Sequence, residues 1–198
     1  RWSISPKIFS YLVVGLALFG LGDALLIQST IGNSPWSVFA QGLSIHTPLS
    51  IGQSTAVISV GVLALWIPLR ERPGFGTLAN IAVISAFVQI GVDHIPQVTL
   101  NFPLQIFYVI AGIGLVGFGS AIYITCGLGP GPRDGLMTAI HNRTKIRVGR
   151  VRLGIEGTVL ILGGLLGGTI GLGTALFALL IGQSIAISLG VVSRVTAQ

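Results

Sequence analysis

The sequence predicts an all-α membrane protein with six transmembrane helices, arranged as two inverted repeats of three. Three observations support this fold class: the composition, an internal repeat and the placement of charge. Hydrophobic residues make up 52% of the 198 residues and charged residues only 8%, whereas soluble globular domains carry about 25% charged residues. A chain this apolar is typical of an integral membrane protein, and we expect one membrane domain over residues 1–198.

The chain contains two copies of one unit, related by an offset of 97 positions (117 − 20). Under this offset, many positions of the first copy meet identical residues of the second, among them Gly20 and Gly117, Gly22 and Gly119, Ala24 and Ala121, Ile27 and Ile124, Gly32 and Gly129, Pro35 and Pro132. The first repeat covers about residues 7–96 and the second about residues 104–193. Duplicated membrane units commonly form a site or pathway where the halves meet.

Six apolar runs are each long enough to cross about 30 Å of hydrocarbon as a helix. In chain order they are Ile8–Gln28, Ile51–Leu69, Thr77–Ile95, Leu104–Cys126, Val151–Gly168 and Thr174–Val192. The first three belong to the first repeat and the last three to the second.

Two shorter segments, Gly32–His46 and Gly129–Asn142, begin with glycine and proline and continue for about three helical turns. Pro35 and Pro132 suit the first position of a helix, where a missing N–H group costs nothing. Ser34 and Gly131 then become the capping residues. We expect two short helices that either re-enter the membrane or lie at its surface.

The basic residues predict the orientation, because cytoplasmic loops are enriched in Lys and Arg. Every one falls on a single face if both termini are cytoplasmic: Arg1, Lys7, Arg70, Arg72, Arg133, Arg143, Lys145, Arg147, Arg150, Arg152 and Arg194. Since each repeat has three spans, the second starts on the opposite side from the first and is inverted. The basic stretch 142–152 is expected to meet the lipid bilayer at anionic headgroups, and no nucleic-acid partner is expected.

In an inverted arrangement the two short helices enter from opposite faces, so re-entrant helices would bring their positive N-termini together near the midplane. Converging helix N-termini favour a small polar or anionic substrate. The alternative is that glycine and proline only form tight turns and the short helices float at the interface. The candidate binding residues are Asp23, Asn33, Ser34, Ser37, Gly129, Gly131, Arg133 and Asp134, of which Ser37 and Asp134 can also meet free N–H groups of the first helical turn.

Charged side chains inside predicted spans are costly and usually face protein or water. Asp23 could bind a proton or cation, or accept a bond from a helix start; the alternative is a carboxylate solvated near the outer interface. Glu156 follows Arg152 by four residues, which favours a structural ion pair. Arg133 replaces Trp36 of the first copy and suits either a lipid phosphate or an anionic substrate. Further polar residues in apolar surroundings include Gln28, Gln41, Asn80 and Gln105.

The sequence shows no pattern of an enzyme. The three histidines are scattered and Cys126 is the only cysteine, so we predict no metal site, no catalytic residues and no cofactor. A homodimer is compatible with the chain.

Several motifs resemble the bacterial YczE-like integral membrane proteins, which are related to the YitT group. They are Gly20-Leu21-Gly22-Asp23-Ala24, Gly32-Asn33-Ser34-Pro35-Trp36, residues 127–137 with their Gly-Pro-Arg-Asp-Gly stretch, and residues 168–174. The resemblance implies a multi-pass protein of the bacterial inner (plasma) membrane. It implies no reaction, substrate or catalytic residue.

The leading functional prediction is a small transporter or channel-like carrier of a small molecule or ion, with its site between the repeats. The alternative is a regulatory or assembly subunit of a membrane complex, which does not itself transport. A polar cavity reaching both glycine-proline segments would favour the transporter, and a solid centre with an apolar outer groove would favour the subunit.

Overall fold

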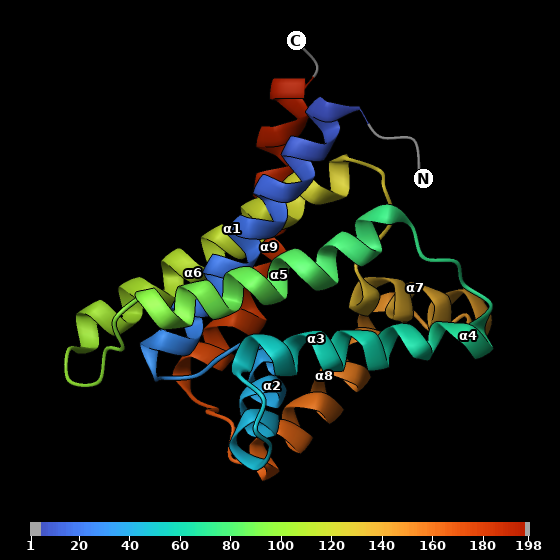
Figure 1. The fold of residues 1–198 in the computed structure, drawn as a ribbon. Coiled ribbons are helices and arrows are strands. Elements are labelled where there is room, and N and C mark those ends of the chain that lie inside the picture. The colour runs from blue at the N-terminus through green and yellow to red at the C-terminus, as the bar shows by residue number, and fades with distance from the viewer. Residues whose placement is uncertain (1–4, 197–198) are drawn as a thin grey trace.

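The computed structural model describes residues 5–196, and this part of the chain is helical with short connections and no strand (Figure 1). The basic residue Arg1 lies outside the described residues. The helices in chain order are α1 (Pro6–Ser29), α2 (Pro35–His46), α3 (Ile51–Ala64), α4 (Trp66–Leu69), α5 (Phe75–His94), α6 (Phe102–Thr125), α7 (Pro132–Thr144), α8 (Val148–Leu165) and α9 (Leu172–Thr196).

Five segments of the described chain are long and apolar enough to cross a membrane: α1, α3 together with α4, α5, α6 and α9. The protein is therefore an all-helical, multi-pass membrane protein. The fifth predicted span corresponds to α8, which carries Arg150, Arg152 and Glu156 and is not among the five. A sixth crossing through α8 stays a prediction.

The short helices begin where the sequence places them. Pro35 and Pro132 occupy the first turns of α2 and α7, with Ser34 and Gly131 as N-caps. The Ser34 hydroxyl accepts the N–H of Ser37 at 3.4 Å. The predicted run Ile51–Leu69 is instead divided at Leu65 into α3 and α4, because Pro68 lacks an N–H donor and its ring crowds the preceding turn.

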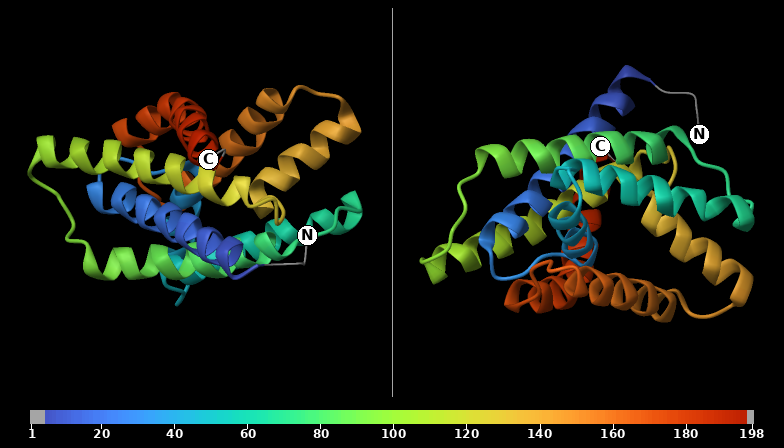
Figure 2. Two further views of the ribbon diagram at one scale, coloured as in Figure 1. Left: turned by 90° about the horizontal axis from the view of Figure 1, so that it is seen from above. Right: turned by 60° about the horizontal axis from the view of Figure 1, so that its bottom comes forward.

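Helices α1 and α6, the equivalent first spans of the two repeats, pack closely along their lengths (Figure 2). A Cβ atom on Gly15 would lie 3.0 Å from the carbonyl oxygen of Gly119, and one on Gly22 would lie 2.7 Å from that of Gly112. Gly15 is equivalent to Gly112 and Gly22 to Gly119. The repeat therefore relates the first contact to the second, with the roles of α1 and α6 interchanged.

A second reciprocal pair of contacts holds the entries to the short helices. Gly76 donates its N–H to the carbonyl of Leu128 at 3.0 Å, and its equivalent Gly173 donates to Ile31 at 2.8 Å. The residues that follow these acceptors, Gly32 and Gly129, have φ angles of +125° and +117°, which glycine adopts without strain. Each turn directs the chain from a long helix into the start of α2 or α7.

The outer helices depart from this reciprocity. Helix α3 packs against α5, whereas its equivalent α8 lacks comparable packing on α9 and lies mainly against α2. Helices α3 and α8 both contact the short helices α2 and α7, and in Figure 1 α2 and α8 lie below α3 whereas α7 lies above α4.

The α1–α6 contact predicts a large difference between two neighbouring glycines of α6. A Cβ on Gly112 would lie 2.8 Å from the Gly22 carbonyl oxygen, while a Cβ on Gly114 would meet nothing within 4 Å. Gly112→Leu should therefore destabilise the protein by about 1–3 kcal/mol through overpacking, and Gly114→Leu should be nearly neutral. Thermal unfolding in detergent, followed by size-exclusion chromatography, checks this; equal melting temperatures would contradict the close helix contact.

Candidate functional site

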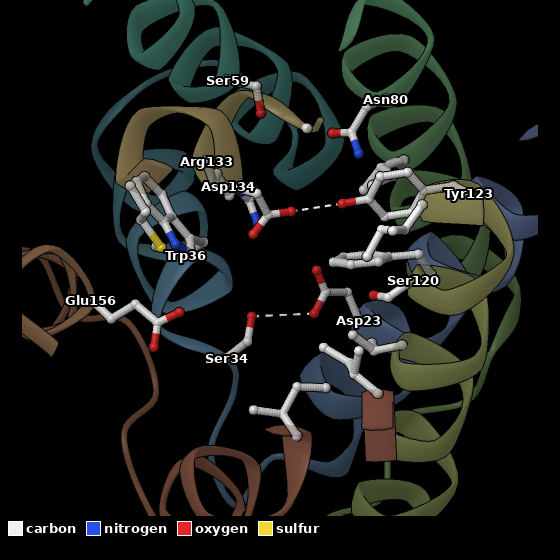
Figure 3. Close-up of a pocket in the computed structure, with 18 of the residues that line it drawn as sticks. Asp23, Ser34, Trp36, Ser59, Asn80, Ser120, Tyr123, Arg133, Asp134 and Glu156 are labelled. Carbon is white, nitrogen blue, oxygen red and sulfur yellow. Dashed lines mark hydrogen bonds between the residues drawn. The ribbon is translucent and has the colours of Figure 1, made fainter. Parts of the chain in front are cut away.

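A polar cavity of about 280 Å³ lies at the centre of the described structure (Figure 3). Every helix except α4 contributes to its wall. The polar and charged lining residues are Asp23, Ser34, Ser59, Asn80, Ser120, Tyr123, Arg133, Asp134, Arg152 and Glu156. Both capping residues of the short helices, Ser34 and Gly131, line it, so α2 and α7 begin inside the protein.

The cavity lies where the two repeats meet. Its lining includes both members of the following equivalent pairs: Phe19 and Val116, Asp23 and Ser120, Ser34 and Gly131, Trp36 and Arg133, Ser59 and Glu156, Asn80 and Phe177, Ile84 and Ile181. Several pairs combine a charged or amide residue with an uncharged partner. The two repeats thus supply one cavity whose charges are arranged asymmetrically.

Asp23 is 2% exposed, and its carboxylate accepts a hydrogen bond from the Ser34 hydroxyl at 3.2 Å. The Ser34 and Ser37 hydroxyl oxygens lie 2.9 Å apart. The two serine hydroxyls share a hydrogen bond, and both interact with the Asp23 carboxylate. Asp23 is therefore tied to the start of α2, one of the two roles that its position in the sequence suggested.

Asp134 has a different role from its repeat equivalent Ser37. Its carboxylate accepts a hydrogen bond from the Tyr123 hydroxyl of α6 at 2.6 Å, and α7 has no side-chain cap at its N-terminus. Asp134 lies in the first turn of α7, as expected, but the hydrogen bond found for its carboxylate is to Tyr123 rather than to a backbone N–H group. Tyr123 donates to this carboxylate and also interacts with the backbone of Gly131 at the start of α7.

Arg133 places its guanidinium carbon 5.0 Å from the ring centre of Trp36, its equivalent in the first repeat. Its charge also interacts with those of Asp23, Asp134 and Glu156. Among the described residues, the ion pair found within 4.0 Å is that of Arg152 with Glu156, so Arg133 interacts with these carboxylates at longer range. Since a guanidinium offers five N–H donors in a planar fork, Arg133 presents unused donors to the cavity.

The predicted pair of Arg152 and Glu156 is confirmed, with Nε and Oε1 2.9 Å apart. Both residues also line the cavity, which their helical spacing did not indicate. The pair consequently contributes one positive and one negative charge to the same chamber as Asp23, Arg133 and Asp134.

Three of the predicted site residues lie outside the cavity lining. Asn33 is buried and donates to the Gln41 side chain at 2.8 Å. Ser37 supports Ser34, as described above. Gly129 lines a neighbouring hollow of about 360 Å³, which shares Tyr123 and Asp134 with the cavity, and its positive φ angle serves the turn into α7.

Four polar lining residues were not predicted as site residues: Ser59, Asn80, Ser120 and Tyr123. The repeat offset relates Ser120 to Asp23 and Ser59 to Glu156, so alignment of the copies could have found these two. The sequence identified Asn80 only as a polar residue within an apolar run, which does not indicate a place in the cavity. Tyr123 is equivalent to Leu26, and no pattern in the sequence signalled its place.

No group of three or more His, Cys, Asp or Glu side chains that could hold a metal ion occurs within residues 5–196. The cavity itself presents hydrogen-bonding side chains, the starts of two helices and charges of both signs.

Comparisons with known proteins place the chain in a family. A model described as a family of unknown function (DUF6198) matches residues 6–189. An uncharacterized protein of Haemophilus influenzae is 44% identical over 98% of this chain and 88% of its own length. The uncharacterized membrane protein YczE of Bacillus subtilis is 34% identical over 91% of this chain and 85% of its own. No solved structure matches. The chain belongs to the DUF6198 family of YczE-like membrane proteins.

Proposed function

We propose that this protein is a transporter of the bacterial cytoplasmic membrane that carries a small anionic solute through the central cavity. One observation carries the proposal: a cavity lined by equivalent residues of both repeats contains an arginine with unused donors. Arg133 supplies the charge and the planar fork that carboxylates and phosphates bind in bidentate fashion. The buried start of α7 adds backbone N–H groups and a positive helix end beside it.

The repeats are inverted in this proposal, with both termini in the cytoplasm. The reciprocal glycine contacts of α1 with α6, and the matching bonds of Gly76 and Gly173, support a twofold relation between the halves. The placement of Lys and Arg supports the orientation. A site on the axis relating two inverted halves can be opened alternately to either face by rocking one half against the other.

The net charge of the cavity indicates that an anion is bound together with a proton. Arg133 and Arg152 face three carboxylates, those of Asp23, Asp134 and Glu156, so the lining carries a formal charge of −1 when all are ionised. Glu156 is paired with the cation Arg152, whereas Asp23 and Asp134 are bonded only to hydroxyls, and of these two Asp23 is buried while Asp134 is exposed. We therefore propose that Asp23 binds a proton together with the anion. Neutralising this carboxylate removes its repulsion of an anion at Arg133.

The second candidate function is a regulatory or assembly subunit without transport activity. An apolar groove between α3 and α8 favours it, because exposed grooves of this kind also receive partner helices. The polar cavity, which a purely structural subunit does not require, favours transport.

Uptake by purified protein in liposomes tests the proposal. Vesicles should accumulate at least one of phosphate, sulfate, acetate, lactate or glutamate when an inward gradient of pH and anion is imposed. The rate should exceed that of protein-free vesicles and saturate with concentration. Uptake equal to that of empty vesicles for every one of these anions would contradict transport of a soluble anion, and if ethyl phosphate also failed to bind the protein, the subunit function would remain.

A further inference from the structure

An apolar groove of about 750 Å³ lies between α3 and α8, on the other side of Trp36 from the polar cavity. Its floor is formed by α2 and α7. The apolar residues that shape it include Phe39, Ile58, Val62, Leu136, Ile140, Val151, Ile155 and Val159. Arg150 is the only charged residue among those that line it.

The groove and the polar cavity share one wall. Trp36 lines both hollows, and Arg133 stands over its ring on the cavity side (Figure 3). The groove also contains equivalent pairs of the two repeats: Phe39 and Leu136, Ile58 and Ile155, Val62 and Val159. Both hollows thus follow the junction of the repeats, and Trp36 with Arg133 forms the boundary between an apolar and a polar compartment.

The flanks of the groove are apolar and exposed. Leu65, between α3 and α4, lines the groove and is 52% exposed, and Leu153 on α8, next to the lining residue Gly154, is 74% exposed. In a chain that crosses the bilayer, such surfaces contact lipid tails. The single base at the groove, Arg150, belongs to the stretch expected at anionic headgroups. The groove therefore has the polarity of an anionic lipid: an apolar channel with a cation at its edge.

We infer that the transported solute is an anionic lipid taken from the bilayer, whose phosphate or carboxylate headgroup binds Arg133 while its acyl chain occupies the groove between α3 and α8. This inference rests on the proposed transport function and adds the class of substrate. Arg150 is the first cation on the path of the headgroup, and Arg133 is the second. The Trp36 side chain must change its conformation to let the headgroup pass from the groove into the cavity.

Alkyl phosphates of increasing length, from ethyl to octyl phosphate, test the chain site by calorimetric titration of the purified protein in detergent. Affinity should rise about two- to fourfold for each added methylene, because each chain carbon leaves water for the groove. In the variant Gly61→Phe, the new ring fills the groove, since a Cβ on Gly61 meets nothing within 4 Å. This variant should bind ethyl phosphate normally and lose the dependence on chain length.

Gly114→Phe is the matched control, because Gly114 is an exposed glycine of α6 with equal free space and no place in either hollow. It should titrate like the wild type, which separates groove binding from partition of the longer chains into detergent. Adding phosphatidylglycerol to the micelles should weaken octyl phosphate binding at least tenfold, and phosphatidylcholine should not. That difference assigns the site to an anionic lipid rather than to a soluble phosphate.

Each contrary result has a defined meaning. Equal affinity for all chain lengths would overturn the lipid inference and leave a site for soluble anions, as would the absence of competition by phosphatidylglycerol. A chain dependence that persists in Gly61→Phe would place the chain elsewhere and also overturn it. A halved particle mass for Gly61→Phe would identify the groove as a contact between two copies. Failure of every alkyl phosphate to bind would remove the anion site itself, and with it the proposed function.

Discussion

Replacing Arg133 by Gln is expected to lower anion affinity and uptake about 100-fold. Gln keeps a polar side chain of similar reach but removes the charge and the bidentate fork. Charge-assisted hydrogen bonds contribute about 1.5–3 kcal/mol each, so the loss of a bidentate pair corresponds to about 3 kcal/mol, or a factor of about 100. Initial rates of uptake into liposomes and equilibrium titration with ethyl phosphate measure the effect.

Two further variants make this result specific. Arg143→Gln removes the same charge from an exposed position of the same helix, α7, and should leave uptake unchanged. Arg133→Lys keeps the charge without the planar fork and should retain part of the affinity. If Arg133→Gln transports like the wild type, Arg133 has no part in binding, and contact with a lipid phosphate becomes the better interpretation of its charge.

The internal repeat made much of the fold predictable. Glycine and proline at equivalent positions fixed the starts of α2 and α7, because Pro35 and Pro132 suit only the first turn of a helix. The long apolar runs gave the long helices for the simple reason that backbone groups in hydrocarbon must be bonded internally. The second run is a candidate span with the predicted bounds, Ile51–Leu69, but its interruption at Leu65, near Pro68, was not predicted.

The cavity was predictable only in outline. Converging helix starts indicated a central site, and Asp23, Ser34, Arg133 and Asp134 all line it. The partners of these residues were harder to predict, because they depend on how the halves pack. Tyr123 reaches Asp134 from α6, and the helical spacing of Arg152 and Glu156 describes their pairing but not the direction in which both side chains face.

The two repeats also differ in helix packing more than their similar sequences would predict. Helix α3 packs on α5, whereas α8 turns away from α9 and toward α2. The repeat alone predicts equal packing in both halves. The charged residues of α8 line the cavity or its neighbouring groove and account for the difference. Packing Arg150, Arg152 and Glu156 against the apolar helix α9 would cost more solvation free energy than packing the uncharged helix α3 against α5.

Asp23→Asn is expected to abolish the coupling of anion uptake to protons while leaving the fold and downhill transport intact. Asn preserves the shape and can still accept the hydrogen bond from Ser34. In the wild type, an anion at Arg133 is compensated by a proton on Asp23, so anion affinity should rise up to tenfold for each unit that the pH falls, by linkage of one proton to one anion. In the variant, the neutral amide makes anion affinity independent of pH, and a pH gradient no longer drives accumulation.

The measurement compares uptake driven by a pH gradient with exchange of labelled for unlabelled anion at equal pH. Asp23→Asn should lose the first and keep the second, which a misfolded protein would not do. Asp93→Asn is the matched control, because Asp93 is exposed near the end of α5 and bonded only to Gln89 among the described contacts; it should keep both activities. The other groups that could carry the proton face the same cavity: Asp134 beside Tyr123, and Glu156 beside Arg152. A tenfold dependence on pH that survives in Asp23→Asn would assign the proton to one of those carboxylates and leave Asp23 as the anchor of the α2 N-terminus.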